Sequence, residues 1–433
     1  MIRKIIIIMA VAVMIGPAAS SAPWSLDSCI NHAIKHNIIV RTRNIESTSA
    51  ELDVVEAKDR FLPQLDAGVS QTFNFGRGLT SDNTYADRNT SQLGWSVNLS
   101  LPIFQGLSAK RRLDYAKANM RSVLENAEAA KDDVTLRVIA QYLQVLYCAE
   151  LHGVALEQVR MSKVELDRRE ILLEAGKIPE LDLTQARSQL AQDELTAVTT
   201  LNDRQLALVE LAQLLQLDDV NGFDIMPLSD TQTILPDAQT VYENALRNNH
   251  AIKASMLSIA AADKNISLAK SGYLPRLSFN VGLGSSYYNI SGIDNDSFHR
   301  QMRDNFNKSL GFTLSIPIFD AFTTRNSERK ARLQLVNARL QYEDTRSALF
   351  KAIQQAYYQA VAAQSKRRAG DVAVKAAKDA LDAMQEKYNY GRANATEFEQ
   401  AKTSYIKAVS EAVQAKYETL LRMRILEFYN GVN

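Results

Sequence analysis

The chain has 433 residues, which is enough for two or three ordinary domains. Charged residues make up 23% of it and hydrophobic residues 46%, a balance that excludes a protein built mainly of membrane helices. The 50 Lys and Arg residues against 49 Asp and Glu residues leave a formal charge of +1, so composition gives no argument for a nucleic-acid partner.

The first 22 residues have the pattern of a secretory signal peptide. Arg3 and Lys4 precede an apolar run that ends at Gly16-Pro17, and small residues up to Ala22 follow. The run is shorter than the ~20 residues that a membrane-spanning helix needs. We therefore expect residues 1–22 to be removed on export, with a short membrane anchor as the alternative.

Export would place Cys29 and Cys148 in a compartment where a disulfide is permitted. The sequence leaves open whether their Cα atoms come close enough for one. We favour two separate free thiols that pack on helices.

The remaining chain repeats one pattern twice. Repeat 1 covers residues 23–217, repeat 2 covers residues 240–433, and an irregular connector at 218–239 joins them. The matching segments are Phe61-Leu62-Pro63 with Tyr273-Leu274-Pro275, Pro102-Ile103-Phe104 with Pro317-Ile318-Phe319, and Gly176 with Gly391.

Each repeat predicts the same order of elements. A helix leads to a Pro, a β-hairpin follows, and then come a very long helix without Pro, a turn centred on Gly, and a returning helix. The expected ranges are 64–101 and 276–317 for the hairpins, 108–174 and 322–388 for the long helices, and Gly176 and Gly391 for the tip turns.

The four strands have one apolar and one polar face, because apolar and polar residues alternate along them. The apolar series are Leu65, Ala67, Val69 and Phe73; Leu93, Trp95, Val97 and Leu99; Leu277, Phe279, Val281 and Leu283; and Leu310, Phe312, Leu314 and Ile316. A soluble sandwich would show the same alternation. Strands of about ten residues with Ser, Asn, Gly and Thr on one face favour a bilayer around a wet lumen. The loops at 76–91 and 289–308 are expected to be irregular outer turns.

The long helices and the strands together predict an oligomer. At ~1.5 Å per residue each long helix would extend roughly 100 Å, and its apolar spacing is typical of coiled-coil packing. Four strands cannot close a barrel, and open strand edges cannot face hydrocarbon. Two copies would give eight strands and little lumen, whereas three would give twelve strands and room for a passage. The fold class is therefore mainly α, with four transmembrane strands per chain.

The doubled order of helix, hairpin, Pro-Ile-Phe and long helix resembles the TolC-like outer-membrane efflux proteins. Residues 101–106 and 316–321 are similar to the family's strand-to-helix junction, and residues 391–401, preceded by Tyr388, to its second tip turn. The resemblance implies a homotrimer in the bacterial outer membrane, with a twelve-stranded barrel and a coiled-coil helical tunnel in the periplasm. The connector 218–239 would belong to an equatorial belt.

The resemblance also implies a function. The channel would be a passive conduit for small molecules or exported polypeptides in a tripartite efflux or type I secretion system. Its partners would be a periplasmic adaptor, docked at the tips Gly176 and Gly391, and an inner-membrane pump driven by ATP or by a proton gradient.

Acids near the tips are candidates for a constriction. Asp182 and Glu397 each stand six residues after a tip glycine, and three-fold symmetry would turn each into a ring of charge. The resemblance implies a closed constriction at Glu397 and Gln400, although Gln400 stands where a second acid is common. An ordinary solvated helix charge is the alternative for Glu397.

The resemblance further implies a gate lock made by Tyr388, with Asp182 as its acceptor. Ala393 stands where the locking Arg is common, so Arg392 is the candidate substitute. Removing the Tyr388 and Arg392 contacts is expected to raise single-channel conductance.

The sequence contains no catalytic constellation, so we expect a protein that is not an enzyme and needs no cofactor. Among its five histidines only His32 and His36 share a helical face at metal-binding spacing, and no Cys or carboxylate completes a metal site. The alternative function is a structural or adhesive coiled-coil assembly with a barrel anchor.

Overall fold

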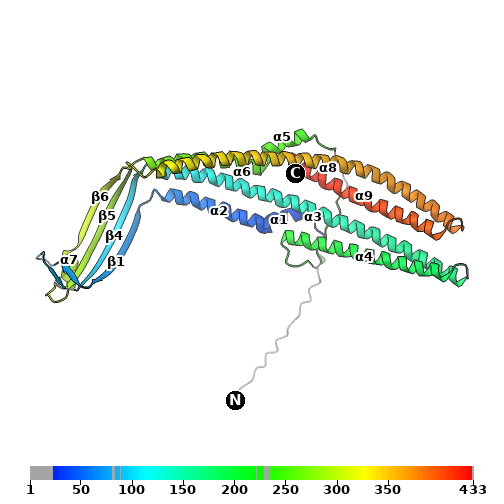
Figure 1. Ribbon diagram of the computed structural model, residues 1–433, viewed down its shortest axis with the longest axis horizontal. Helices are drawn as coiled ribbons and strands as arrows, with labels where there is room; N and C mark the ends of the chain where they lie inside the picture. The colour runs from blue at the N-terminus through cyan, green and yellow to red at the C-terminus, as the bar shows by residue number, and fades with distance from the viewer. Residues whose placement is uncertain (1–22, 80–82, 88, 221, 229–233, 432–433) are drawn as a thin grey trace, which may run out of the picture. The chain divides into compact units, whose positions relative to one another are not determined.

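The computed structural model describes residues 23–79, 83–87, 89–220, 222–228 and 234–431 (Figure 1). The expected signal peptide at 1–22 lies outside these residues. The chain forms two compact units, and each takes segments from both repeats. The helical unit takes the described residues within Met1–Arg41, Ala130–Ala245 and Lys351–Asn433, and the sheet unit takes those within Thr42–Ala129 and Leu246–Phe350.

The sheet unit contains one four-stranded sheet, as expected from the four alternating segments. Its strands are β1 (Gln64–Asn74), β4 (Thr90–Gln105), β5 (Arg276–Ile290) and β6 (Asn307–Ser315). They lie side by side in the order β1-β4-β5-β6, with every neighbouring pair antiparallel (Figure 1).

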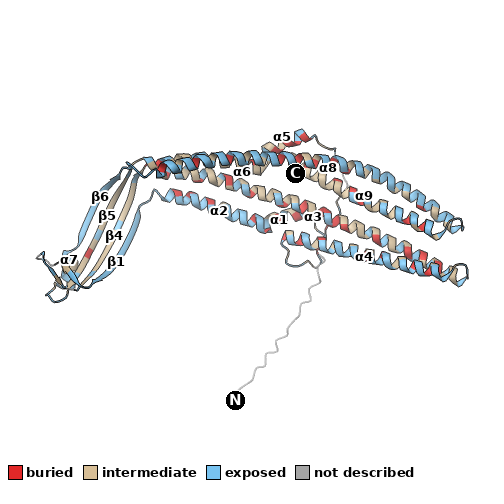
Figure 2. Cartoon of the chain, viewed as in Figure 1, coloured by how far each residue is buried: buried red, intermediate tan, exposed pale blue. Residues whose placement is uncertain are grey.

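The register of the sheet aligns the two faces across all four strands. One rung consists of Leu65, Leu99, Val281 and Leu310, and the next consists of Asp66, Asn98, Gly282 and Ser309. One face is therefore apolar along this part of the sheet, and the opposite face is polar. The outer strands β1 and β6 are exposed along their whole length (Figure 2).

Both loops between paired strands are more ordered than the sequence predicts. The first contains a short antiparallel ladder of β2 (Arg77–Leu79) and β3 (Tyr85–Asp87). The second contains the helix α7 (Phe298–Asp304), whose N-cap Ser297 accepts a hydrogen bond from the Arg300 backbone N–H. The prediction of irregular turns was wrong here, because elements this short depend on contacts rather than on periodicity.

The two strand-to-helix junctions share an unusual backbone. Gly106 and Leu107 in repeat 1, and Ala321 and Phe322 in repeat 2, all have positive φ angles between 52° and 62°. Left-handed backbone costs a residue with a side chain roughly 1–2 kcal/mol. The matched conformation shows that the internal repeat extends to the path of the main chain.

The long helices begin directly after these junctions. They are α3 (Ser108–Glu174) and α8 (Thr323–Asn389), and their returning partners are α4 (Glu180–Leu215) and α9 (Ala395–Asn430). No helix in the described part of the chain is both long enough and apolar enough to span a bilayer.

The helix expected before each strand pair is in fact two helices. Repeat 1 has α1 (Leu26–His36) and α2 (Ile38–Asp59), and repeat 2 has α5 (Ala238–Asn248) and α6 (His250–Ala269), followed by the short η1 (Lys270–Tyr273). Asparagine stands at both breaks. Asn37 Oδ1 accepts the Ile39 N–H at 2.9 Å, and Asn249 Oδ1 accepts the Ile252 N–H at 3.1 Å. These side chains compete with the helical bonds and start a new helix.

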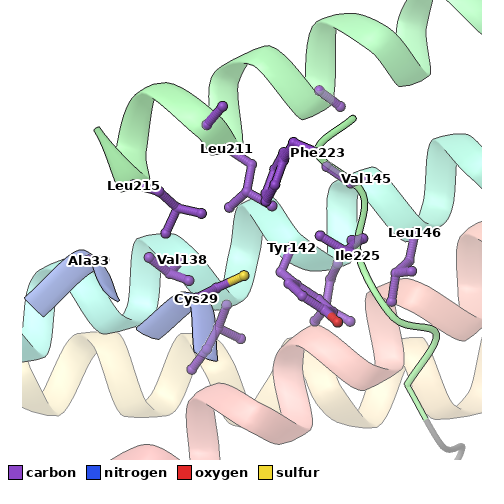
Figure 3. Close-up of a cluster of buried hydrophobic side chains, with 14 of the residues drawn as sticks. Cys29, Ala33, Val138, Tyr142, Val145, Leu146, Leu211, Leu215, Phe223 and Ile225 are labelled. Carbon is purple, nitrogen blue, oxygen red and sulfur yellow. The ribbon is translucent and has the colours of Figure 1, made fainter. Parts of the chain in front are cut away.

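A cluster of buried apolar side chains, which we call the apolar cluster, packs the first hairpin of the helical unit against α1 and the connector (Figure 3). Its labelled members come from α1, α3, α4 and the connector: Cys29, Ala33, Val138, Tyr142, Val145, Leu146, Leu211, Leu215, Phe223 and Ile225. The Tyr142 hydroxyl lies 2.6 Å from the Met226 carbonyl oxygen and 3.0 Å from that of Trp24. The cluster therefore joins the connector to the first described residues.

Cys29 and Cys148 are both buried as free thiols in the helical unit. Burial raises the pKa of Cys29 to about 12 and also raises the pKa of Cys148. Both thiols therefore stay protonated and act as small apolar side chains.

Candidate functional site at the helix tips

The tips of the helical unit are two turns centred on glycine, between α3 and α4 and between α8 and α9. Gly176 has φ +66° and Gly391 has φ +72°, and both are exposed. The Lys177 N–H donates to the Leu172 carbonyl at 2.8 Å, and the Arg392 N–H donates to the Lys387 carbonyl at 2.7 Å. Each turn thus ends its helix with a left-handed residue and satisfies carbonyls that the helix leaves free.

Tyr388 lies at the end of α8 and contacts both α3 and α9. Its hydroxyl donates to Glu165 Oε1 at 2.6 Å. Its ring stacks on Phe398 of α9 at 5.2 Å, and the Arg168 guanidinium lies 4.4 Å from its centroid. Arg168 Nη1 also donates to Asn389 Oδ1 at 2.7 Å. Burial, together with the bond to Glu165, raises the pKa of Tyr388 and keeps its hydroxyl a donor.

Glu165 connects Tyr388 to the first hairpin. Its carboxylate pairs with Arg169 Nε at 2.8 Å, and both side chains are buried. Arg169 Nη1 donates in turn to the backbone carbonyl of Asp182 on α4 at 3.0 Å. The chain of contacts therefore joins α8 to α3 and α4, and we call Tyr388, Glu165, Arg168 and Arg169 the Tyr388 lock.

Within the protomer, these contacts differ from the two that the resemblance implies. Within this protomer the acceptor of the Tyr388 hydroxyl is Glu165, and Asp182 takes part only through its backbone carbonyl. The arginine at the Tyr388 ring is Arg168, whereas Arg392 is exposed and contributes its backbone N–H to the tip turn. Position near the turn does not indicate Glu165 and Arg168, because both lie on α3, which is distant in sequence from Tyr388.

The two candidates for the constriction are both exposed on α9. Glu397 has a local role that the sequence analysis did not assign. Its carboxylate accepts the Asn394 N–H at 2.9 Å, and Asn394 Oδ1 accepts the Glu397 N–H at 2.8 Å, which is a capping box. Gln400 stands one turn further along and accepts a bond from Ser404 Oγ through its carbonyl at 2.9 Å.

A second group of polar residues near the tips was missed by the sequence analysis. Asp193 of α4 and Lys402 of α9 are only 1% and 2% exposed, and Ser162 of α3 lies between them. Ser162 Oγ donates to Asp193 Oδ2 and accepts from Lys402 Nζ, while Nζ lies 3.5 Å from Asp193 Oδ2. We call these three residues the buried ion triad.

Two glutamines complete the surroundings of the triad. Gln158 Nε2 and Gln189 Nε2 donate to Asp193 Oδ1 at 2.7 and 2.8 Å. Lys402 Nζ is also 3.4 Å from Glu399 Oε2. Buried charges are tolerated only when they are paired and hydrogen-bonded, so these contacts make the relative position of α3, α4 and α9 specific.

A sequence signal for the triad existed. Asp193 falls on the same helical stripe as Ala186 and Ala197, which are both buried, and Lys402 stands four residues after buried Phe398. A charge on an apolar stripe at helical spacing predicts a buried ion pair.

The two histidines that share a helical face are in contact with each other. The rings of His32 and His36 stack at 4.2 Å. Burial, followed by the charges of His36 and Lys35, lowers the pKa of His32. Over the described residues, no three His, Cys, Asp or Glu side chains are grouped so as to hold a metal ion.

The sequence is similar to known outer-membrane proteins along nearly its whole length. It is 22% identical to the outer membrane efflux protein BepC of Brucella suis, over 94% of this chain and 85% of BepC. It is 24% identical to the outer membrane protein TolC of Vibrio cholerae, over 93% of this chain and 90% of TolC. It is 24% identical to the alkaline protease secretion protein AprF of Pseudomonas aeruginosa, over 80% and 71% of the two chains.

Solved structures show the same fold. The CmeC outer membrane channel of Campylobacter jejuni matches with a TM-score of 0.78 at 17% identity, over 94% of this chain and 85% of CmeC. The outer membrane protein VceC of Vibrio cholerae matches with a TM-score of 0.77 at 15% identity, over 94% and 96%. The profile of the outer membrane efflux protein family matches residues 29–216 and 241–431, one match in each repeat. The chain belongs to the outer membrane efflux protein family.

Proposed function

We propose that three copies of this chain form one outer-membrane conduit whose periplasmic entrance is closed at the helix tips. The observation that carries the proposal is the four-stranded sheet with an apolar face, a polar face and exposed outer strands β1 and β6. In a bilayer the backbone groups along both edges need partners. Three copies would supply twelve strands, which closes a barrel wide enough for a passage.

The polar face of the sheet would line the passage. Its rungs carry the polar side chains of Ser, Asn and Asp beside glycines, as in the rung of Asp66, Asn98, Gly282 and Ser309. Such a wall binds no particular solute strongly, so size and charge would decide what passes. The names of the relatives cover both efflux, for BepC, and alkaline protease secretion, for AprF. We therefore place the choice of cargo in an inner-membrane pump, joined through a periplasmic adaptor.

The tip turns are the proposed docking surface for the adaptor. Gly176 and Gly391 are exposed, and a Cβ atom added at either would meet nothing within 4 Å. A partner can therefore approach the backbone of both turns closely. A bulky substitution such as Gly391→Trp should reduce co-purification with the adaptor more than Gly391→Ala, which carries the same left-handed backbone strain but adds only a methyl group.

The gate follows from the contacts at the tips. The Tyr388 lock and the buried ion triad both hold the α8–α9 hairpin against the α3–α4 hairpin within one subunit. Three copies would place Glu397 and Gln400 as rings around the axis and close the entrance. Exposed Arg392 and the side chain of Asp182 would be available to the neighbouring subunit. Releasing the second hairpin would open the passage.

Two measurements on the purified full-length protein in detergent test this function. Native mass spectrometry should give the mass of three chains, and a folded monomer would overturn the proposal. Incorporation into a planar bilayer should give discrete single-channel currents. A trimer that produces no current in wild-type form or after disruption of the tips would instead support the adhesive or structural assembly.

A further inference from the structure

The outer end of β5 extends beyond the strand that pairs with it. The β5–β6 ladder ends where Gly284 lies opposite Asn307, whereas β5 continues to Ile290. On its other side β5 stays paired with β4 up to Ile290. The β5 edge beyond Gly284 would present free N–H and C=O groups to any strand that approached it.

Side-chain amides take these backbone groups instead. Gln301 of α7 accepts the Tyr288 N–H through Oε1 at 2.9 Å and donates to the Tyr288 carbonyl through Nε2 at 3.0 Å. Asn295 does the same for Ile290, accepting its N–H at 2.9 Å and donating to its carbonyl at 2.8 Å. Each side chain thus makes both bonds that a residue of a neighbouring strand would make.

A third amide continues the series at the spacing of a strand. Asn305 Nδ2 donates to the Ser286 carbonyl at 2.7 Å. The bonded residues are Ser286, Tyr288 and Ile290, which are every second residue. In an antiparallel sheet these are the positions whose backbone groups all point to the same side. We call Asn295, Gln301 and Asn305 the amide ladder.

Other contacts hold the amide ladder in place. Phe298 of α7 packs on Tyr287 at 5.3 Å between ring centroids, and Phe306 stacks on Trp95 at 6.1 Å. Buried Ser285 donates through Oγ to the Met302 carbonyl at 2.7 Å. The segment is therefore fixed to β4 and β5 by packing as well as by its amides.

We propose that residues 295–305 act as a surrogate strand, which closes the outer end of β5 and confines pairing with a second copy of this chain to β6 (Asn307–Ser315). The partner edge is β1 (Gln64–Asn74), which is exposed along its whole length. A β1 strand that slid outward past β6 would meet amides already bonded to β5 and find no free backbone there. The surrogate strand would thereby help to fix the register between subunits. This part rests on the proposed trimer.

Hydrogen exchange measured by mass spectrometry on the full-length protein in detergent tests whether the amide ladder covers the backbone of β5. In Gln301→Leu the amide of Tyr288 should exchange about tenfold faster, because its acceptor is lost. His299→Leu adds the same side chain at an exposed position of α7 and should leave that amide protected. Equal exchange in all three proteins would show that Gln301 does not cover the β5 edge.

Cysteine cross-linking tests the seam between subunits, in a background where Cys29 and Cys148 are replaced by alanine. A series of single cysteines along β1 is combined with Ser309→Cys on β6 or with Tyr288→Cys on β5. Cross-links between subunits should form with position 309 and not with position 288. Cross-links of equal yield at position 288 would overturn the proposal that pairing between subunits is confined to β6. A monomeric protein would overturn the proposed trimer. Hydrogen exchange would still test whether the amide ladder covers the β5 edge.

Discussion

The apolar cluster and the helix tips hold the helices of one unit together by different physical means. The apolar cluster buries Val, Leu, Ile and Phe side chains and two protonated thiols. The tips rely on ion pairs, hydrogen bonds and one stacked tyrosine, in the Tyr388 lock and the buried ion triad. Separating apolar side chains costs free energy in proportion to the apolar area that becomes exposed to water. Separated ions can instead be hydrated again.

This difference suggests a division of labour. The apolar cluster should stay closed throughout transport, because opening it would expose apolar surface with no compensating interaction. The contacts at the tips can be broken and reformed, since water can solvate both halves of each ion pair. Hydrogen bonds also fix one geometry, so the proposed closed state would be specific without being permanent. Variants in the two regions should therefore affect stability and conductance differently.

The largest loss of stability is expected for Asp193→Ala. The change removes the buried Asp193 carboxylate from the buried Lys402 ammonium and leaves only the partly exposed Glu399 beside it. Breaking a buried ion pair costs ~3–5 kcal/mol. The double variant Asp193→Leu with Lys402→Met removes both charges and should recover most of the loss. Denaturant unfolding followed by circular dichroism, at fixed protein concentration, measures both. If the single variant is as stable as the wild type, the triad contributes nothing.

A similar loss is expected for Leu211→Ala in the apolar cluster, where Leu211 is fully buried. Leucine-to-alanine changes in a core cost ~2–5 kcal/mol, depending on the cavity that remains. Unlike the tip variants, this one should leave the single-channel conductance unchanged. The same unfolding assay gives the loss of stability, and a clear change in conductance would show that the cluster takes part in gating.

A smaller loss is expected for Tyr388→Phe, which removes the hydrogen bond to buried Glu165 and costs ~1–3 kcal/mol. In the wild type the pKa of Tyr388 is raised, so this contribution is complete below pH 10.0, the ordinary value, and is lost as the pH rises through the raised pKa. Limited proteolysis near the tips should be faster in the variant than in the wild type at neutral pH. In the wild type it should become faster as the pH rises above 10.0. Proteolysis that is equally fast in the two proteins at neutral pH would contradict this role.

The smallest effect on stability is expected for Glu397→Gln. Glutamine can complete the same capping box with Asn394, so unfolding should change by less than ~0.5 kcal/mol. The variant loses the charge that would form the ring, and its preference for cations over anions should fall in bilayer recordings with a salt gradient. Unchanged ion selectivity would leave Glu397 with its capping role alone.

Periodicity and repeated motifs predict much of the fold. The alternation of apolar residues predicts the four strands, and the doubled Pro-Ile-Phe segment marks the two junctions that share a left-handed backbone at Leu107 and Phe322. Such features depend on residues that are close in sequence. The split of the first helices at Asn37 and Asn249 is equally local, and it could have been predicted from the capping preference of asparagine.

The partners at the tips could not be predicted in the same way. Tyr388 bonds to Glu165 across 223 positions, and Lys402 reaches Asp193 across 209. Which residues meet depends on how each long helix is rotated about its axis. The apolar stripes constrain that rotation without fixing it to one residue. The resemblance implies Asp182 as the acceptor of Tyr388, whereas within the protomer the Tyr388 hydroxyl bonds to Glu165. A role of Tyr388 in gating stays a prediction.

Single-channel recording of Tyr388→Phe combined with Arg168→Ala, beside Leu211→Ala, tests the division between the two regions most directly. Loss of the hydroxyl and of the guanidinium at the Tyr388 ring should free the second hairpin and raise the conductance above that of the wild type. Leu211→Ala should conduct like the wild type although it is less stable. Conductance that rises in Leu211→Ala and stays unchanged in the tip variant would contradict the account.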